Sequence, residues 1–201
     1  MKGFSKLASS IFHPLFTPII GTLCYFKITP QYYTANLFMG NILPILILTV
    51  IVPLVCYIIL RSVGAISSFS APSLEERKYP LYISLGLLLL IVYKVIPNNY
   101  SKELFFFFLG LVAATFSTLL LLFMRFKSSM HLMGLGTLTM LLINLSVHFE
   151  VNIIFAIATA IICTGIVATS RLYLKANSSS EIIVGFLIGL VSQFITIKYW
   201  L

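Results

Sequence analysis

The sequence has no aspartate and few charges of either sign. Charged residues make up 9% of its 201 residues, apolar residues make up 60%, and the mean hydropathy is +1.07. A soluble globular domain carries roughly 25% charged residues, so this chain cannot cover a surface that faces water. We therefore predict an integral membrane protein with almost no soluble part.

Cysteine and carboxylate usage exclude further classes. Cys24, Cys56 and Cys163 lie far apart in apolar runs, without the spacing of a disulfide framework or a metal site. The five glutamates are scattered, which argues against a carboxylate metal centre. The net charge of +8 comes from basic residues at the ends of apolar runs, the usual membrane pattern. We expect no metal, no cofactor and no nucleic-acid partner.

Hydrophobic runs dominate the chain. A membrane span needs about 20 helical residues, and seven runs come near this length: 10–29, 40–62, 80–97, 103–125, 129–148, 151–170 and 181–201. The first run contains Pro14 and Pro18, which predict a bent or re-entrant element. The fold class that follows is an all-α, polytopic transmembrane bundle forming one domain over 1–201. It has six spanning helices plus a short N-terminal hydrophobic helix, or seven spans if that run crosses.

The basic residues are distributed unevenly between the two membrane faces. If all seven runs cross, the N-terminus and loops 63–79, 126–130 and 171–180 share one face, with nine basic residues against four on the other. That excess favours a cytoplasmic location for the first face. Five of the nine are also candidate ligand-binding residues, namely Arg77, Lys78, Lys127, Arg171 and Lys175. Without them the count is four against four, so the orientation stays open.

Polar side chains from three loops converge on that first face. The segments ERKYP (76–80), KSSMH (127–131) and SRLYLKANSSSE (170–181) bring together Arg77, Lys78, Lys127, His131 and Arg171. Several cations near a histidine suit a phosphate group, which arginine can grip through two hydrogen bonds at once. We therefore expect an anion-binding site at this surface.

The same segments resemble the type 2 phosphatidic acid phosphatase superfamily, membrane lipid phosphatases with a six-helix core. That family's third motif is Ser-Arg, five residues, His, three residues and Asp, usually with Gly four residues further on. Here Ser170 and Arg171 are followed, at the same spacing, by Asn177, Glu181 and Gly185. Ser129 and His131 resemble the second motif, and ERKYP is a loose counterpart of the first. The motifs span roughly 75–190, within a phosphatase-like core of about 40–201.

The resemblance implies a role for each matched position. It makes His131 the general acid and makes Arg77, Lys78 and Arg171 ligands of the phosphate, and Lys127 joins them as a neighbouring cation. The family's attacking histidine is replaced by Asn177, whose carboxamide has no basic lone pair and cannot form a phospho-enzyme. Glu181 takes the place of the aspartate that orients that histidine. The resemblance therefore implies a catalytically impaired lipid-phosphatase-like protein that binds a lipid phosphate or a membrane partner.

Alternative interpretations remain open at this stage. The chain could be an active lipid-phosphate or undecaprenyl-pyrophosphate phosphatase with an altered site, or a non-catalytic subunit of a membrane complex. Glu181 is also explained by a helix start, and His13 and His148 are expected to be lone residues without a functional partner.

The family resemblance is closest to small members found in Bacteroidetes. It implies a bacterial cytoplasmic (inner) membrane and membrane lipids as partners.

Overall fold

The computed structural model describes residues 2–30, 35–66, 74–96 and 101–199 of the chain. Within these ranges every regular element is helical and no strand occurs. The main helices are α1 (Lys2–Ile11), α2 (Thr17–Ile28), α3 (Ala35–Leu46), α4 (Val52–Ser62), α5 (Lys78–Leu90), α6 (Lys102–Phe123), α7 (Met130–His148), α8 (Ile154–Tyr173) and α9 (Ser179–Ile197). π-Helical turns continue α3 into α4 over Ile47–Ile51 and extend α5 over Ile91–Val95. Seven helical segments of the described chain are long and apolar enough to cross a membrane, so the all-α membrane-bundle prediction is confirmed.

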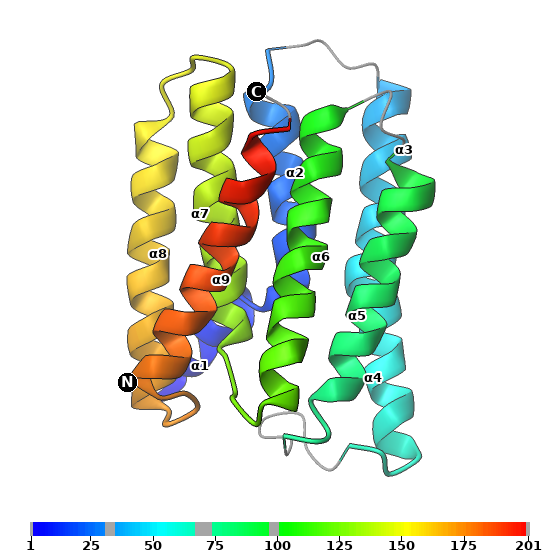
Figure 1. The fold of residues 1–201 in the computed structure, drawn as a ribbon, viewed down its shortest axis with the longest axis vertical. Helices are drawn as coiled ribbons and strands as arrows, with labels where there is room; N and C mark the ends of the chain where they lie inside the picture. The colour runs from blue at the N-terminus through cyan, green and yellow to red at the C-terminus, as the bar shows by residue number, and fades with distance from the viewer. Residues whose placement is uncertain (1, 31–34, 67–73, 97–100, 200–201) are drawn as a thin grey trace.

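The first hydrophobic run forms a bent segment rather than one straight helix. α1 ends at Ile11, and a short 3₁₀ turn over Pro14–Phe16 leads into α2. Proline lacks an N–H and is tolerated in the first turn of a helix but not in its interior, so the break falls at Pro14. The two pieces together run from the end of the bundle that holds the N-terminus to the opposite end (Figure 1). The described part of the chain therefore has seven segments that run the length of the bundle, and α1 begins at the end opposite to the one where α9 finishes.

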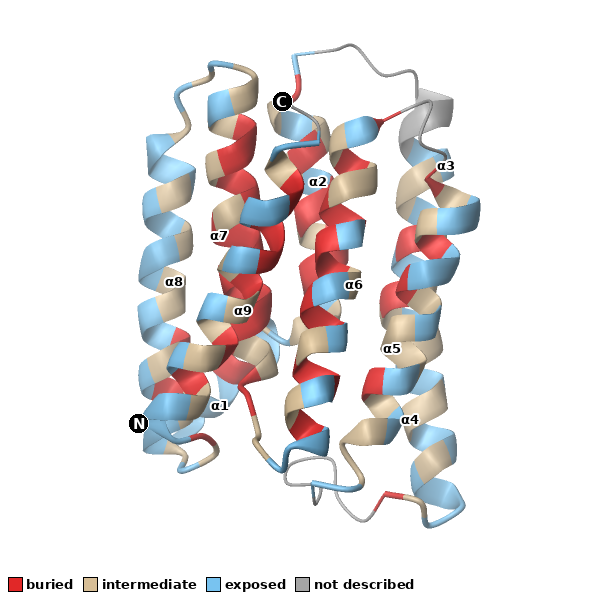
Figure 2. Ribbon diagram, in the orientation of Figure 1, coloured by how far each residue is buried: buried red, intermediate tan, exposed pale blue. Residues whose placement is uncertain are grey.

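Helix α7 forms the centre of the bundle, and α9 packs against it more extensively than any other pair of helices. Figure 2 shows buried positions concentrated along α7, whereas most of α8 is exposed or half-buried. Glycines allow the two backbones to approach closely. A Cβ at Gly185 would overlap the backbone of Ser129, and one at Gly189 would overlap the backbone of Met133. The Gly185–Gly189 pair therefore serves packing within this chain.

Hydrogen bonds between polar side chains and backbone connect the three central helices. Gln193 on α9 donates from Nε2 to the carbonyl of Phe107 on α6 at 2.9 Å. Asn144 on α7 donates from Nδ2 to the carbonyl of Gln193 at 3.2 Å. Both polar side chains are almost fully buried. Lipid offers no alternative hydrogen-bond partners, so a change in the helix packing would leave these buried polar groups unpaired. The bonds therefore stabilise the observed arrangement of the three helices.

Candidate functional site

The candidate site is built around the short link between α8 and α9. The N–H of Ala176 donates to the carbonyl of Arg171, and the N–H of Lys175 donates to that of Leu172. This pattern is a Schellman motif, and it places Lys175 in the left-handed region with φ 53°. The chain therefore reverses direction immediately after α8, and Asn177 comes back beside Arg171.

Helix α9 then begins with a capping box. The hydroxyl of Ser178 accepts a hydrogen bond from the N–H of Glu181, and the Glu181 carboxylate accepts one from the N–H of Ser178, both at 3.3 Å. This arrangement satisfies two of the unpaired donors at the helix start and places negative charge where the helix dipole favours it. Glu181 therefore has a structural role, as the sequence suggested.

Asn177 bridges the two charged residues of the third motif. Its amide oxygen accepts from Nε of Arg171 at 2.9 Å, and its amide nitrogen donates to Oε2 of Glu181 at 2.7 Å. The side chain is buried, with 7% of its surface exposed. The three positions that match the motif spacing thus form one hydrogen-bonded chain at the lower end of the bundle in Figure 1.

Lys127, from the link between α6 and α7, completes this group. Its ammonium donates to the carbonyl of Ala176 at 2.5 Å and lies 3.3 Å from Oε2 of Glu181. Burial is the main cause that lowers the pKa of Lys127, and the positive charge of Arg77 lowers it further, while Glu181 acts in the opposite direction. A bound anion would offset the effect of Arg77 and favour the charged form of Lys127.

Arg77 lies at the start of α5 and reaches the same charged group. Burial lowers the pKa of its guanidinium from the ordinary value, and Glu181 opposes that effect. Arg77 is also within electrostatic range of Arg171. Lys127 therefore contacts the carboxylate of Glu181, while Arg77, just before α5, and Arg171, in the last turn of α8, lie within electrostatic range of it.

His131 lies near Arg171 but is held by α1. Its Nε2 is 3.1 Å from the carbonyl oxygen of Ser9, one of the last four carbonyls of that helix. A carbonyl only accepts, so Nε2 carries the proton and donates it, and in the neutral ring only Nδ1 remains as an acceptor. Its ring also makes an edge contact with His13 at 5.4 Å between centroids. This geometry gives His131 the role of capping α1.

Buried hydroxyl groups adjoin these residues. The N–H of Ser129 donates to the carbonyl of Glu181 at 2.9 Å and so joins the start of α7 to the start of α9. The hydroxyls of Ser9, Ser128 and Ser129 are buried and have no hydrogen-bond partner among the described residues. Buried polar groups are normally paired, so these three hydroxyls have unused capacity for water or a polar ligand.

The remaining basic residues of this face lie outside the group. Lys78, the first residue of α5, pairs at 2.6 Å with Glu75 in the turn before that helix, and its ammonium lies over the ring of Phe123. The phosphate-binding role that the resemblance implies for Lys78 stays a prediction. Arg125 and Lys175 are exposed and occupy left-handed positions after α6 and α8.

Two histidines expected to be lone residues have partners. His13 contacts His131 because the bend before Pro14 returns the chain to the surface that holds the site. His148 lies 3.4 Å from the carboxylate of Glu103, which also accepts a hydrogen bond from the hydroxyl of Tyr25. This second group lies at the other end of α7, far from the third motif. The sequence contained a signal for this pair. Glu103 begins the run 103–125 and His148 ends the next run, 129–148, so two consecutive spans place both residues at the same membrane face.

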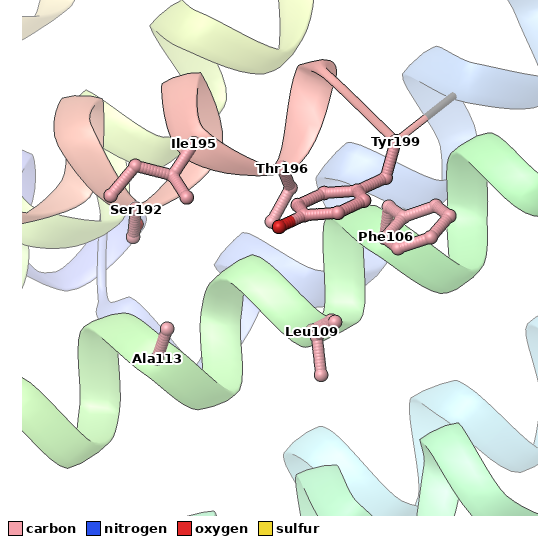
Figure 3. Close-up of a pocket in the computed structure, with 7 residues that line it drawn as sticks. All are labelled: Phe106, Leu109, Ala113, Ser192, Ile195, Thr196 and Tyr199. Atoms are coloured by element: carbon pink, nitrogen blue, oxygen red, sulfur yellow. The ribbon is translucent and has the colours of Figure 1, made fainter. Parts of the chain in front are cut away.

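An apolar hollow of about 340 Å³ lies between α6 and α9 (Figure 3). Phe106 and Tyr199 stack along it with ring centroids 5.7 Å apart, and Ser192, Thr196 and Tyr199 contribute its hydroxyl groups. None of the residues lining it carries a carboxylate, an imidazole or a basic group. It therefore offers contact area without reactive groups.

The fold and the site together define a polytopic α-helical membrane protein with a cationic cluster at one membrane face. Comparison with protein-family models, with curated proteins and with solved structures found no match. Chemically, the cluster can bind and orient an anion. Asn177, Glu181 and His131 as they lie here supply no activated nucleophile.

Proposed function

We propose that this chain is a catalytically impaired relative of the type 2 phosphatidic acid phosphatases that binds the phosphate of a membrane lipid in a bacterial cytoplasmic membrane. The kinship rests on the spacing of Ser170, Arg171, Asn177, Glu181 and Gly185. The membrane setting is supported by the apolar helices. Phosphate binding is supported by the charged group at the link between α8 and α9.

The observation that carries the proposal is a group of cations at Glu181. Lys127 contacts its carboxylate, Arg171 is joined to it through Asn177, and Arg77 lies within electrostatic range. The Lys127 and Glu181 side chains are only about a fifth exposed, at 22% and 20%. Cations withdrawn from water need counter-charges, and the Glu181 carboxylate already accepts from Asn177 and the N–H of Ser178. A phosphate monoester carries nearly two negative charges and several acceptor oxygens. It would neutralise the excess positive charge of the cluster and accept hydrogen bonds from the donors that face it.

The loss of catalysis is proposed from three features that act together. Asn177 cannot attack phosphorus, since its lone pairs are not basic. Glu181, in the orienting position, accepts hydrogen bonds from an amide and caps α9. His131 donates from Nε2 to the backbone of α1. Removal of a covalent nucleophile typically lowers the rate by several powers of ten.

A binding measurement with matched charge variants tests the proposal. Arg171→Gln removes a charge from the cluster, and Arg125→Gln removes one from an exposed position on the same face. The protein in nanodiscs is titrated with fluorescent phosphatidic acid, with diacylglycerol as the lipid that lacks phosphate. We expect Arg171→Gln to weaken phosphatidic acid binding about tenfold or more, as loss of a charged bidentate contact should. We expect Arg125→Gln to bind as the parent does. Equal affinities for the two lipids, or equal effects of the two variants, would refute phosphate recognition at this cluster.

A further inference from the structure

A second hollow lies between α1 and α8, at the end of the bundle that holds the cationic cluster. It is an open hollow of about 600 Å³, within the range of roughly 300–1,000 Å³ typical of small-molecule sites. One wall is a face of α8 that runs from Ile162 to Tyr173, and the other includes Phe4 and Ser5 of α1. We call it the α1–α8 groove. None of its lining residues is charged.

Small residues create the groove. Gly165 lies in the α8 wall, and a Cβ built there would meet no heavy atom within 4 Å. On α1 the inward positions are Ser5, Ala8 and Ser9, while Phe4 and Leu7 are exposed. The helix thus packs by its small residues and presents its large apolar ones outward, a pattern suited to a lipid environment.

The groove adjoins the cluster through both of its walls. Ser170 is in the α8 wall with 3% of its surface exposed, and the next residue, Arg171, donates to Asn177. Ser5 is in the α1 wall, and one helical turn later the carbonyl of Ser9 accepts from His131. The apolar hollow therefore adjoins the cationic cluster at Ser170, the neighbour of Arg171, and its α1 wall leads to Ser9 and His131.

We infer that the α1–α8 groove holds a hydrocarbon chain of the same phosphorylated lipid whose phosphate binds beside Arg171, an inference that rests on the proposed function. The occupant is an amphiphile with an anionic phosphate head and a long apolar chain. Its chain lies along α8 and buries apolar surface, and its head reaches the cations. A neutral lipid such as diacylglycerol in the groove would bring no phosphate to Arg171 and Lys127, and a zwitterionic phospholipid would bring a phosphate diester whose single charge is offset by the cation of its own head group. A phosphate monoester carries nearly two negative charges. Charge complementarity therefore favours a lipid that ends in a phosphate monoester.

Substitution at Gly165 tests this assignment, with Gly86 as a matched control. Both glycines lie within membrane-spanning helices, and a Cβ at either would meet nothing within 4 Å. Gly165→Leu places a side chain in the groove, Gly165→Ala a smaller one, and Gly86→Leu adds the same bulk on α5. The probes are long-chain phosphatidic acid, its short-chain soluble analogue, and long-chain diacylglycerol.

We expect Gly165→Leu to weaken binding of long-chain phosphatidic acid about tenfold, with a smaller loss for Gly165→Ala. Binding of the short-chain analogue should not change, and Gly86→Leu should behave as the parent towards every probe. Unchanged long-chain affinity in Gly165→Leu, while Arg171→Gln abolishes binding, would overturn the groove assignment and leave the phosphate site standing. Parent-like binding in both Gly165→Leu and Arg171→Gln would overturn the proposed function as well. Diacylglycerol binding as tight as that of phosphatidic acid, with the same sensitivity to Gly165→Leu, would mean that the groove holds ambient lipid only.

Discussion

The amide oxygen of Asn177 accepts a hydrogen bond from Nε of Arg171 at 2.9 Å. The amide nitrogen of Asn177 donates to Glu181 at 2.7 Å, so one neutral side chain satisfies a cation on one side and an anion on the other. A neutral imidazole could make the same two bonds, with one ring nitrogen as acceptor and the other as donor. Asparagine at this position therefore keeps the connections of a histidine and lacks only its basicity.

This equivalence predicts that Asn177→His restores chemistry without disturbing the site. The new imidazole would donate to Glu181, which would orient it. Its second nitrogen would be the nucleophile once the phosphate draws the Arg171 guanidinium away from it. We expect phosphate release from phosphatidic acid or undecaprenyl pyrophosphate by Asn177→His and none by the parent, measured by a phosphate assay in detergent micelles. Turnover by the parent that disappears in His131→Ala would show instead that the existing site is active.

The opposite change, Asn177→Asp, should damage both stability and binding. A carboxylate cannot donate to Glu181, so two acceptors would face each other where a 2.7 Å hydrogen bond now exists. We expect a loss of about 1–3 kcal/mol in the free energy of unfolding, and weaker phosphatidic acid binding because the added charge neutralises the cluster. Asn152→Asp is the control, since Asn152 is exposed and only accepts from the N–H of Ile154. Thermal unfolding with equal midpoints for the two variants would contradict this interpretation of the bridge.

The pH dependence of binding should report on Lys127. Its pKa in the folded protein is lowered, chiefly by burial, so the free protein loses this charge at a lower pH than an unfolded chain would. A charged Lys127 therefore reduces stability at neutral pH, and its contribution to stability rises as the pH increases through the lowered pKa towards about 10.4. The affinity for phosphate should instead decrease as the pH rises, because the neutral amine of deprotonated Lys127 does not attract an anion.

We therefore expect phosphatidic acid affinity to fall as the pH rises above neutral towards about 10.4, the ordinary pKa of lysine. The phosphate monoester stays dianionic throughout this rise because its second pKa is about 6. The arginine of Lys127→Arg stays charged at every pH used, so this variant should bind phosphatidic acid with an affinity that does not change with pH. Fluorescence titrations of the parent and the variant at several pH values and matched ionic strength measure these affinities. A parallel fall in both proteins would assign the effect to another group.

The spans could be predicted from the sequence because lipid imposes a simple requirement on it. Each spanning helix must be apolar for about 20 residues, and the polar links stand out. The run predicted at 129–148 corresponds to α7, Met130–His148, and the run at 103–125 to α6, Lys102–Phe123. Whether the first run crosses could not be predicted, since two prolines fix where the chain bends but not in which direction it continues.

The site was predictable to the extent that it is local. Arg171, Asn177 and Glu181 are six and four residues apart across a helix end, so a tight reversal brings them together. Contacts that depend on tertiary packing were not readable in the same way. His13 reaches His131 through the bend of the first segment, and Lys78 pairs with Glu75 and lies over Phe123.

Lys175→Gly should stabilise the protein. Lys175 occupies the left-handed region, which costs a non-glycine residue about 1–2 kcal/mol, while glycine loses roughly 0.5–1 kcal/mol more in backbone entropy on folding. We expect a net gain of about 0.5–1 kcal/mol from these two terms. Lys198→Gly is the control because Lys198 has φ −57° and gains no relief. A thiol-reactive dye can follow unfolding, since Cys24, Cys56 and Cys163 are free and partly buried. A lower midpoint for Lys175→Gly would show that its left-handed backbone is not a source of strain.

Gly189→Ala should destabilise the contact on which the site depends. The added Cβ would overlap the carbonyl oxygen of Met133 and lie 2.7 Å from the amide nitrogen of Thr137, so α9 must move away from α7. Overpacking of this kind costs about 1–3 kcal/mol. The displacement should also weaken phosphatidic acid binding, because it strains the hydrogen bond from Ser129 on α7 to Glu181 on α9. Gly86→Ala, where a Cβ meets nothing within 4 Å, should leave both quantities unchanged or raise stability slightly. Equal unfolding midpoints for these two variants would show that α7 and α9 tolerate separation and that their close packing does not hold the site together.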